Sequence, residues 1–228
     1  MSINTEEDTS FTTVITIARE LGSGGSYVAR QVAKRLGYAY IDRQILQQAA
    51  RELGLEESEL ERRNERLQSF WDKLITVLAI GAPGHVYAPP PRWVSDEKLV
   101  ECERRLICEL AVKGPCVVLG HGAFHLLRGK ARLLNVLIHA PLSFRIQRVI
   151  SIYGADDERE AARIIDRSDN ERTRYIRFFT GLDRFDARNY HIAIDTAMVD
   201  FATAEEIITS AASNLQTEND RPWVNEPV

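Results

Sequence analysis

The residues best suited to carry chemistry form a short run near the start of the chain, which consists of Gly22, Ser23, Gly24, Gly25 and Ser26. An apolar stretch typical of a buried strand precedes the run, and an amphipathic stretch with helical spacing follows it as far as Leu36. Glycine permits tight turns and the close approach of a ligand. Backbone N–H groups at the start of a helix attract anions because they lack partners. The run therefore predicts a phosphate-binding turn, although a glycine-rich connection without a ligand would have the same sequence.

The same run matches part of the nucleotide-binding pattern G-x-x-x-x-G-K-[ST]. Its last glycine falls on Gly24, and its hydroxyl residue, which contacts a metal ion beside the phosphates, falls on Ser26. Gly25 occupies the place of the lysine, and Arg19 occupies the place of the first glycine. The positive charge of the lysine is therefore missing, and Arg19 is one candidate to replace it. Ser26 could instead serve only as a helix cap.

Polar residues also follow two other predicted strands. Asp42 and Arg43 follow residues 38–41, and His121 follows the apolar run 116–119. The carboxyl ends of parallel strands meet at one edge of a sheet and bind ligands there, so these residues are expected to share a site with the glycine turn. The alternatives are that Asp42 caps the helix after it and that Arg43 forms a surface ion pair.

Arginine is concentrated between residues 160 and 180, in a set that comprises Arg163, Arg167, Arg172, Arg174 and Arg177. The arginine side chain binds two oxygens of one phosphate at once, which lysine cannot do. Asp166 and Asp169 lie close to Arg167 and Arg172 in sequence and could hold the two guanidinium groups in place before a ligand binds. The other interpretation is a solvated helix face with ion pairs between successive turns.

Strands that alternate with helices predict an α/β fold, a five-stranded parallel sheet flanked by helices. The expected strands are the apolar run near residues 14–17 and residues 38–41, 116–119, 133–139 and 190–195. Helices are expected after the glycine turn, over 44–53 and within 56–80, and also over 95–112, 123–127, 156–166 and 203–214. One further helix is expected to start at Pro141, and a separate arginine-rich helix is expected to end near 179. Residues 81–93 contain several prolines and predict a loop.

The length of 228 residues suits a single domain, which we place at residues 11–215. A disordered lead-in over 1–10 and a polar tail over 216–228 are expected to flank it. Residues 56–112 predict a helical insertion that either covers the site or forms a homodimer contact, and residues 155–180 predict an arginine-rich lid. These boundaries rest on changes in composition along the chain.

The charge of the chain argues against two classes of partner. The net charge is −4 and the isoelectric point is near 5.8, which disfavours general binding to nucleic acid or to a membrane surface. The first ten residues are polar, and no apolar run approaches the roughly 20 residues needed to span a bilayer. A cytoplasmic protein is therefore expected.

Five segments, in order along the chain, resemble the motifs of a known family. They are ITIARELGSGG at 15–25, YIDRQIL at 40–46, VVLGHGA at 117–123, the spaced residues Asp166, Asp169 and Arg172, and IDT at 194–196. With them the chain resembles the cytidylate kinase-like branch of the P-loop nucleoside monophosphate kinases. That branch usually lacks the P-loop lysine, and it has arginine where this chain has His121.

The resemblance implies a P-loop NTPase fold and transfer of the γ-phosphoryl group of ATP, with Mg²⁺, to CMP, dCMP or a similar small acceptor. It implies a donor-phosphate site at Gly22–Ser26, with Ser26 on the Mg²⁺ side. The implied acceptor contacts are Asp42, Arg43, His121 and Asp169. The residues implied to act on the transferred group are Arg167, Arg172 and Arg19. Replacement of Gly24 by valine is expected to abolish ATP binding and to leave the fold intact.

Two other functions remain open on the sequence. The first is a non-catalytic nucleotide-binding or regulatory protein on a degenerate kinase fold, which would bind ATP without transfer to any acceptor. The second is a structural dimer built on residues 56–112, which would show no rise in melting temperature with nucleotide.

Overall fold

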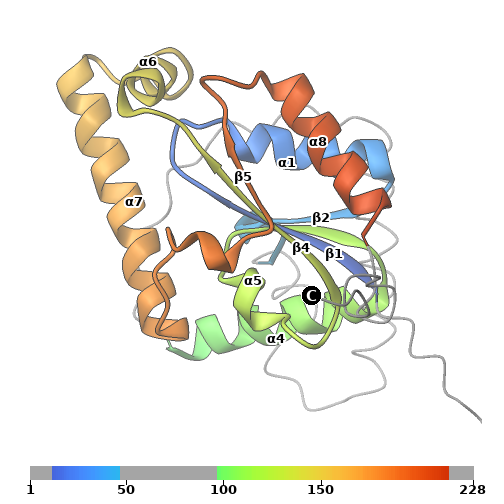
Figure 1. Cartoon of the computed structure of the whole chain (residues 1–228). Helices are drawn as coiled ribbons and strands as arrows, with labels where there is room; N and C mark the ends of the chain where they lie inside the picture. The colour runs from blue at the N-terminus through green and yellow to red at the C-terminus, as the bar shows by residue number, and fades with distance from the viewer. Residues whose placement is uncertain (1–11, 47–96, 216–228) are drawn as a thin grey trace, which may run out of the picture.

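The computed structural model describes residues 12–46 and 97–215, which fold around one sheet of five parallel strands (Figure 1). In chain order the strands are β1 (Thr13–Arg19), β2 (Ala39–Ile41), β3 (Cys116–Leu119), β4 (Arg132–His139) and β5 (Ile192–Asp195). They lie in the order β2-β3-β1-β4-β5, and every neighbouring pair is parallel. The predicted fold class is therefore confirmed, with β1 at the centre of the sheet.

Helices cover both faces of the sheet. Helices α1 (Gly25–Leu36) and α8 (Phe201–Ser213) pack together on one face, and α4 (Glu97–Lys113) and α5 (Ala123–Leu126) lie on the other (Figure 1). Helices α6 (Leu142–Tyr153) and α7 (Glu158–Thr180) pack against each other at one end of the sheet. This end is where the carboxyl ends of β1 and β3 meet α7.

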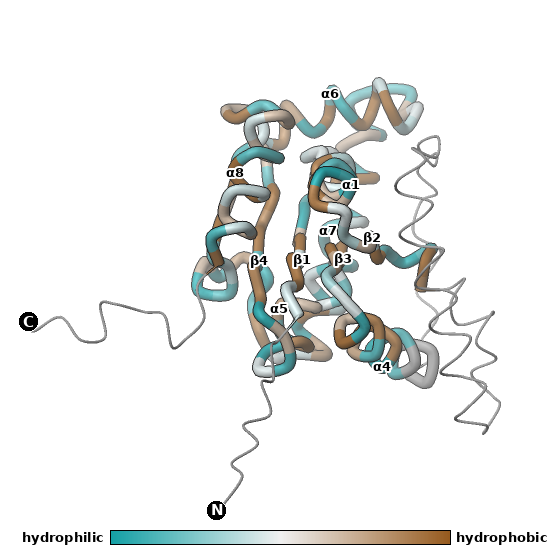
Figure 2. Tube along the Cα trace, turned by 90° about the vertical axis from the view of Figure 1, so that its right-hand side faces the viewer, coloured by the Kyte–Doolittle hydropathy of each residue, from teal (hydrophilic) through white to brown (hydrophobic). Residues whose placement is uncertain are grey.

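Side chains on both faces of β1 are buried in the core, which fixes the position of this strand. Ile15 and Ile17 belong to the buried cluster under α1 and α8, whereas Val14 belongs to the cluster under α4. Alternate residues of a strand point to opposite faces, so β1 is buried on both sides, and its apolar residues run through the middle of the molecule in Figure 2. Arg19, at the end of this strand, is fixed relative to both layers of helices.

The first helix begins and ends as the glycines predict. Gly24 precedes α1 with a φ of 81°, and Gly37 ends it with a φ of 66°. The Gly37 N–H donates to the carbonyl oxygens of Ala33 and Lys34, which is a common way to close a helix. The predicted strand–turn–helix unit is therefore present.

The prediction of two helices between residues 156 and 179 is wrong, because α7 is one helix of 23 residues. The segment contains neither glycine nor proline, so nothing in its backbone interrupts the helix. The Asp157 side chain accepts from the Glu160 N–H at the start, and Gly181 ends the helix with a φ of 69°. The strand predicted over 190–195 is shorter than expected, because β5 begins at Ile192 after the 3₁₀ turn η1 (Ala187–Asn189).

The predictions for residues 1–10, 47–96 and 216–228 lie outside the described residues. These include the helix over 56–80 and the loop over 81–93. Within the described ranges, no helix is both long and apolar enough to cross a bilayer.

Candidate active site

The glycine turn connects β1 to α1 and presents several backbone N–H groups. The N–H groups of Tyr27 and Val28 both donate to the Gly24 carbonyl oxygen, at 2.9 and 3.1 Å. Among the described residues, the N–H groups of Gly24, Gly25 and Ser26 have no acceptor in the protein. The first turn of α1 also contains no acidic side chain. The turn is therefore equipped to bind an anion at the positive end of a 12-residue helix.

Ser23 has a structural role in this turn. Its fully buried hydroxyl lies 2.9 Å from the Glu20 carbonyl oxygen and 3.2 Å from that of Ile138. The Thr196 hydroxyl in turn donates to the Ser23 carbonyl oxygen at 2.6 Å. These bonds connect the turn to the ends of β4 and β5, and they direct the Ser23 hydroxyl toward the interior of the protein.

The glycines are required by packing as well as by φ. A β-carbon on Gly24 would lie 2.5 Å from the ring of Phe201 on α8, and one on Gly22 would lie 2.8 Å from the Arg145 carbonyl oxygen. Both residues also have φ above 80°, where a side chain is strained. The expectation that Gly24→Val abolishes ATP binding and leaves the fold intact stays a prediction, and the new side chain would have to displace the Phe201 ring.

A cavity of about 140 Å³ lies at the carboxyl ends of β1 and β3, and residues 22–26 of the turn are not among those that line it. The loop after β3, the helices α4 and α7, and residues 184 and 190 complete its walls. Its positively charged lining consists of Arg19, Arg43, Arg172 and Arg184. Aromatic and aliphatic groups line other parts of it, namely Phe124, Tyr175, Ile176 and Tyr190. A cationic wall beside ring-lined apolar walls suits a planar group that carries phosphate.

Arg19 connects the glycine turn to this cavity. A β-carbon on Gly25 would lie 2.6 Å from Arg19 Cβ, and one on Gly120, after β3, would lie 2.4 Å from Arg19 Nη1. The side chain therefore extends from beneath the turn to the opposite loop. Its Nε is buried without a partner, and no carboxylate among the described residues pairs with it. Burial, followed by the charges of Arg172 and Arg184, lowers the pKa of Arg19 to about 9.

Asp169 holds three arginines in position, namely Arg145, Arg172 and Arg184. Its carboxylate is 2.5 Å from Arg145 Nη1, 3.1 Å from Arg172 Nη1 and 3.9 Å from Arg184 Nη1. It also accepts a hydrogen bond of 3.1 Å from the Leu21 N–H of the glycine-turn segment. One carboxylate thus orders several guanidinium groups and attaches α7 to the turn.

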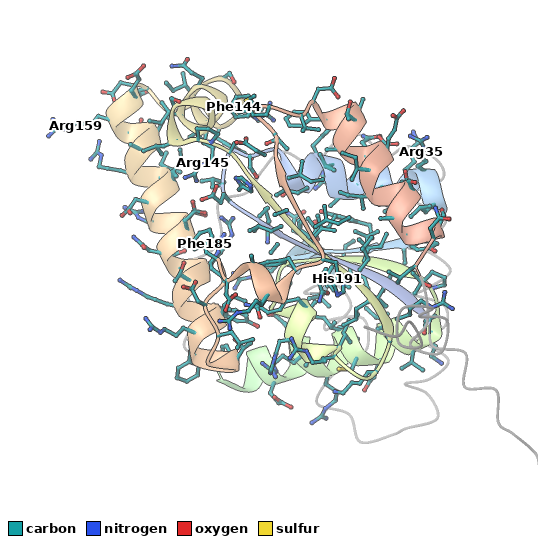
Figure 3. The ribbon with its side chains drawn as sticks, viewed as in Figure 1. Arg35, Phe144, Arg145, Arg159, Phe185 and His191 are labelled. Atoms are coloured by element: carbon teal, nitrogen blue, oxygen red, sulfur yellow. The ribbon has the colours of Figure 1, made fainter. Side chains whose placement is uncertain are left out.

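Arg145 and Arg148 brace this arrangement rather than line the cavity. Arg145 is buried and also pairs with Glu20 at 3.4 Å, and Figure 3 shows it between α6 and the sheet. Arg148 donates to the Gly22 carbonyl oxygen at 3.0 Å and stacks on the Phe201 ring at 4.6 Å. Both contacts fix the outer side of the glycine turn.

His121 enters the cavity in an unusual backbone conformation, with a φ of 57° between two glycines that also have positive φ. Its Nδ1 lies 3.5 Å from Oε2 of Glu103 on α4. Glu103 is 5% exposed, and its other oxygen, Oε1, has no hydrogen-bond partner among the described residues. The Ser168 hydroxyl, also buried in the cavity wall, is likewise unpaired there. The cavity wall therefore contains polar groups whose hydrogen-bonding capacity the described residues do not use.

The structure brings some predicted residues together and separates others. Arg19, Arg43, His121 and Arg172 line one cavity, and the predicted Asp169 pairs with Arg172 beside it. Asp42 caps residues 43–46 by accepting from the Ile45 N–H at 3.1 Å, and it does not line the cavity.

Arg167 lies away from this site. It is exposed on α7 and does not line the cavity, and the same helix carries Arg163, Arg174 and Arg177 as exposed side chains. Arg159, near the start of α7, points away from the molecule in Figure 3. The α7 helix thus directs one arginine of the predicted set into the cavity and the rest toward solvent.

The predictions from sequence omit several polar residues of the cavity, among them Glu103, Ser168, Glu171, Tyr175 and Arg184. Arg184 is 3% exposed and donates to the Arg19 carbonyl oxygen at 2.8 Å and to that of Asp169 at 3.1 Å. Burial, together with the nearby carboxylate of Glu103, raises the pKa of Tyr175 to about 12.

Comparison with known proteins identifies the family and supports the fold. The sequence model of the cytidylate kinase-like family matches residues 14–198. A cytidylate kinase from Aeropyrum pernix is 28% identical over 193 residues, which are 84% of this chain and 94% of that protein. The crystal structure of an uncharacterized protein from Eubacterium ventriosum has the same fold, with a TM-score of 0.65 and 21% identity over 88% of this chain and 98% of that one.

Proposed function

The chain belongs to the cytidylate kinase-like family, and from that premise we propose that it transfers the γ-phosphoryl group of ATP to CMP, dCMP or a similar nucleoside monophosphate. The family supports phosphoryl transfer of the nucleotide-kinase type. One observation supports the finer assignment: four arginines line a single cavity, and one of them, Arg19, also lies against Gly25 of the glycine turn. Phosphoryl transfer needs positioning and positive charge more than covalent help from the protein.

The glycine turn is the donor site in this proposal. The N–H groups of Gly24, Gly25 and Ser26 would hold phosphate oxygens, and the half-buried Ser26 hydroxyl would be a ligand for Mg²⁺. Bound Mg²⁺ would neutralise charge on the phosphate oxygens during transfer. The absence of an acidic side chain in the first turn of α1 suits a polyanion at this position.

Arg19 takes the place of the missing lysine. It starts beneath the donor turn and ends beside the acceptor cavity, so its guanidinium lies between the two reactants. The bond from the γ-phosphorus to the bridging oxygen breaks as a bond from an acceptor phosphate oxygen forms, and ADP leaves. Arg19 stabilises the charge on the transferred group, while Arg172 and Arg184 hold the acceptor phosphate.

The test is a transfer assay with Mg·ATP and a panel of acceptors that includes CMP, dCMP, UMP and AMP. We expect a labelled γ-phosphate to appear in the diphosphate of at least one cytidine nucleotide. Binding of ATP without transfer to any acceptor would support the non-catalytic alternative. Removal of Mg²⁺ by a chelator should stop the reaction without unfolding the protein, which a melting curve checks.

A further inference from the structure

The cavity contains one histidine, and its backbone is strained. His121 has a φ of 57° between Gly120 and Gly122, and it is the one non-glycine residue with a positive φ among the described residues. It is also the one histidine among the described residues that line the cavity. Backbone strain of this kind costs about 1–3 kcal/mol and is concentrated at functional sites. The side chain is 10% exposed, so it is held firmly and still reaches the cavity.

The other charged and titratable groups that line the cavity with His121 keep their charge state near neutral pH. Four are guanidinium groups from β1, from α7 and from the segments that follow β2 and α7, namely Arg19, Arg43, Arg172 and Arg184. Two are carboxyl groups, those of Glu103 on α4 and Glu171 on α7. Burial raises the pKa of Tyr175 and of Tyr190 to about 12, so both phenols are neutral. Histidine is the side chain that gains and loses a proton near neutral pH, so His121 is the switchable charge of this lining.

Charges of opposite sign act on the His121 imidazole. Its Nδ1 lies 3.5 Å from Oε2 of Glu103, and this buried carboxylate stabilises a proton on the ring. The four guanidinium groups oppose that proton, because like charges repel. A phosphate dianion that enters the cavity cancels part of the guanidinium charge. The balance then shifts toward the protonated imidazole, which adds a positive charge for the phosphate.

We propose that His121 takes up a proton when the acceptor binds, so that the affinity for a monophosphate increases as the pH falls from about 8 to about 6. This inference rests on the proposed function for its ligand class, a nucleoside monophosphate. It does not depend on the orientation of the ligand, because charges interact across a cavity of about 140 Å³. Acceptor binding and proton binding favour each other equally, so either can be measured.

The experiment measures the Kd of CMP by calorimetry in wild type, His121→Arg and His121→Asn. Arginine keeps its charge throughout, whereas asparagine has none and tolerates a positive φ. The wild-type Kd divided by that of His121→Arg should rise about five- to tenfold from about pH 6 to about pH 8. The Kd of His121→Asn should exceed that of wild type by about the same factor at the lower pH and equal it at the higher pH. These ratios cancel the ionisation of CMP itself and that of Arg19, whose pKa is about 9.

Proton uptake gives a second measurement. Calorimetry in two buffers with different ionisation enthalpies should show that wild type takes up more protons per CMP than either His121 variant. His125→Asn is the matched control, because His125 is a partly buried histidine on α5 that does not line the cavity, and it should behave as wild type. One folded variant of His121 suffices, since each removes the titrating group. Equal proton uptake and Kd ratios that do not change with pH would overturn the proposal.

Transfer and proton uptake separate this inference from the proposed function. If no acceptor is phosphorylated but CMP binding takes up a proton through His121, the proposed reaction fails while the role of His121 stands. If transfer occurs and CMP binding takes up no proton that depends on His121, the role of His121 fails while the reaction stands. If none of the monophosphates in the panel binds, both fail.

Discussion

Arg19 combines a cost in stability with a benefit in catalysis, and replacing it by methionine separates the two. Methionine keeps most of the length of the side chain and removes its charge. The drop of the Arg19 pKa from 12.5 to about 9 corresponds to at most about 5 kcal/mol of unfavourable charging free energy in the folded protein. The side chain is partly exposed to the cavity, so solvent reduces this cost. We therefore expect Arg19→Met to raise the free energy of unfolding by about 1–2 kcal/mol.

The direction of this change in stability follows from the charge of Arg19 in the folded and in the unfolded protein. Arg19 is charged at pH 7 both folded and unfolded, so the folded state bears the full cost below a pH of about 9 and loses it as the pH rises toward 12.5. Without nucleotide, Arg19→Met should therefore melt about 2–8 °C above wild type at pH 7. Its kcat should fall about a thousandfold, the range found for arginines that stabilise transferred phosphoryl groups.

The assays are thermal unfolding without nucleotide and steady-state transfer with Mg·ATP and CMP. Arg159→Met is the control, because Arg159 is exposed at the far end of α7, and it should change neither quantity. A variant that melts below wild type and retains kcat within about threefold would refute the reasoning on both counts.

Three further predictions test the other parts of the site. Ser26→Glu should weaken ATP binding at least tenfold in calorimetry, because a carboxylate suits a helix N-terminus but repels phosphate. Ser26→Gln, which has the same size without the charge, should weaken it less. In the transfer assay, Arg172→Ala should lower kcat/KM for CMP about a hundredfold and Arg167→Ala less than fivefold. Equal effects would contradict the interpretation of this cavity as the acceptor site. Asp169→Asn should lower the free energy of unfolding by about 3–5 kcal/mol in urea titrations, because buried guanidinium groups lose their counter-ion.

The sheet and the glycine turn were predictable because local signals determine them. Apolar residues on both sides of β1, followed directly by glycines, leave few alternatives to a buried parallel strand and a tight turn. The ambiguity at Asp42 was also visible in advance, since a side chain that follows a strand and precedes a helix suits a cap as well as a ligand. Only the tertiary structure shows that Asp42 caps residues 43–46 and that its neighbour Arg43 lines the cavity.

The choice between Arg167 and Arg172 depends on the phase of one helix. Residues five apart on a helix point about 140° apart, so both cannot face the same cavity. The buried stripe of α7 includes Ile165, Ser168 and Tyr175, and Arg172 continues this spacing whereas Arg167 does not. A division into two helices near residue 166 interrupts this stripe, so its continuity is visible only when residues 158–180 form one helix.

Glu103 left a comparable signal in α4. It lies four and seven residues before Ile107 and Leu110, both fully buried, so a carboxyl group occupies a position of the apolar stripe. A glutamate at such a position needs a partner, and its position on the apolar face could have marked it as a site residue. Arg184 lies in an irregular segment between α7 and β5, where no periodicity predicts which side chains are buried.

The balance of charge in the site explains why these particular residues act together. Asp169 neutralises part of the charge of Arg145, Arg172 and Arg184 and orders them without a ligand. Arg19 has no such counter-ion among the described residues, and its buried Nε has no hydrogen-bond partner there. An incoming phosphate satisfies Arg19 directly, whereas it must share the other arginines with Asp169. The acceptor phosphate and the transferred group should therefore bind where Arg19 connects the turn to the cavity, which is the position that phosphoryl transfer between them requires.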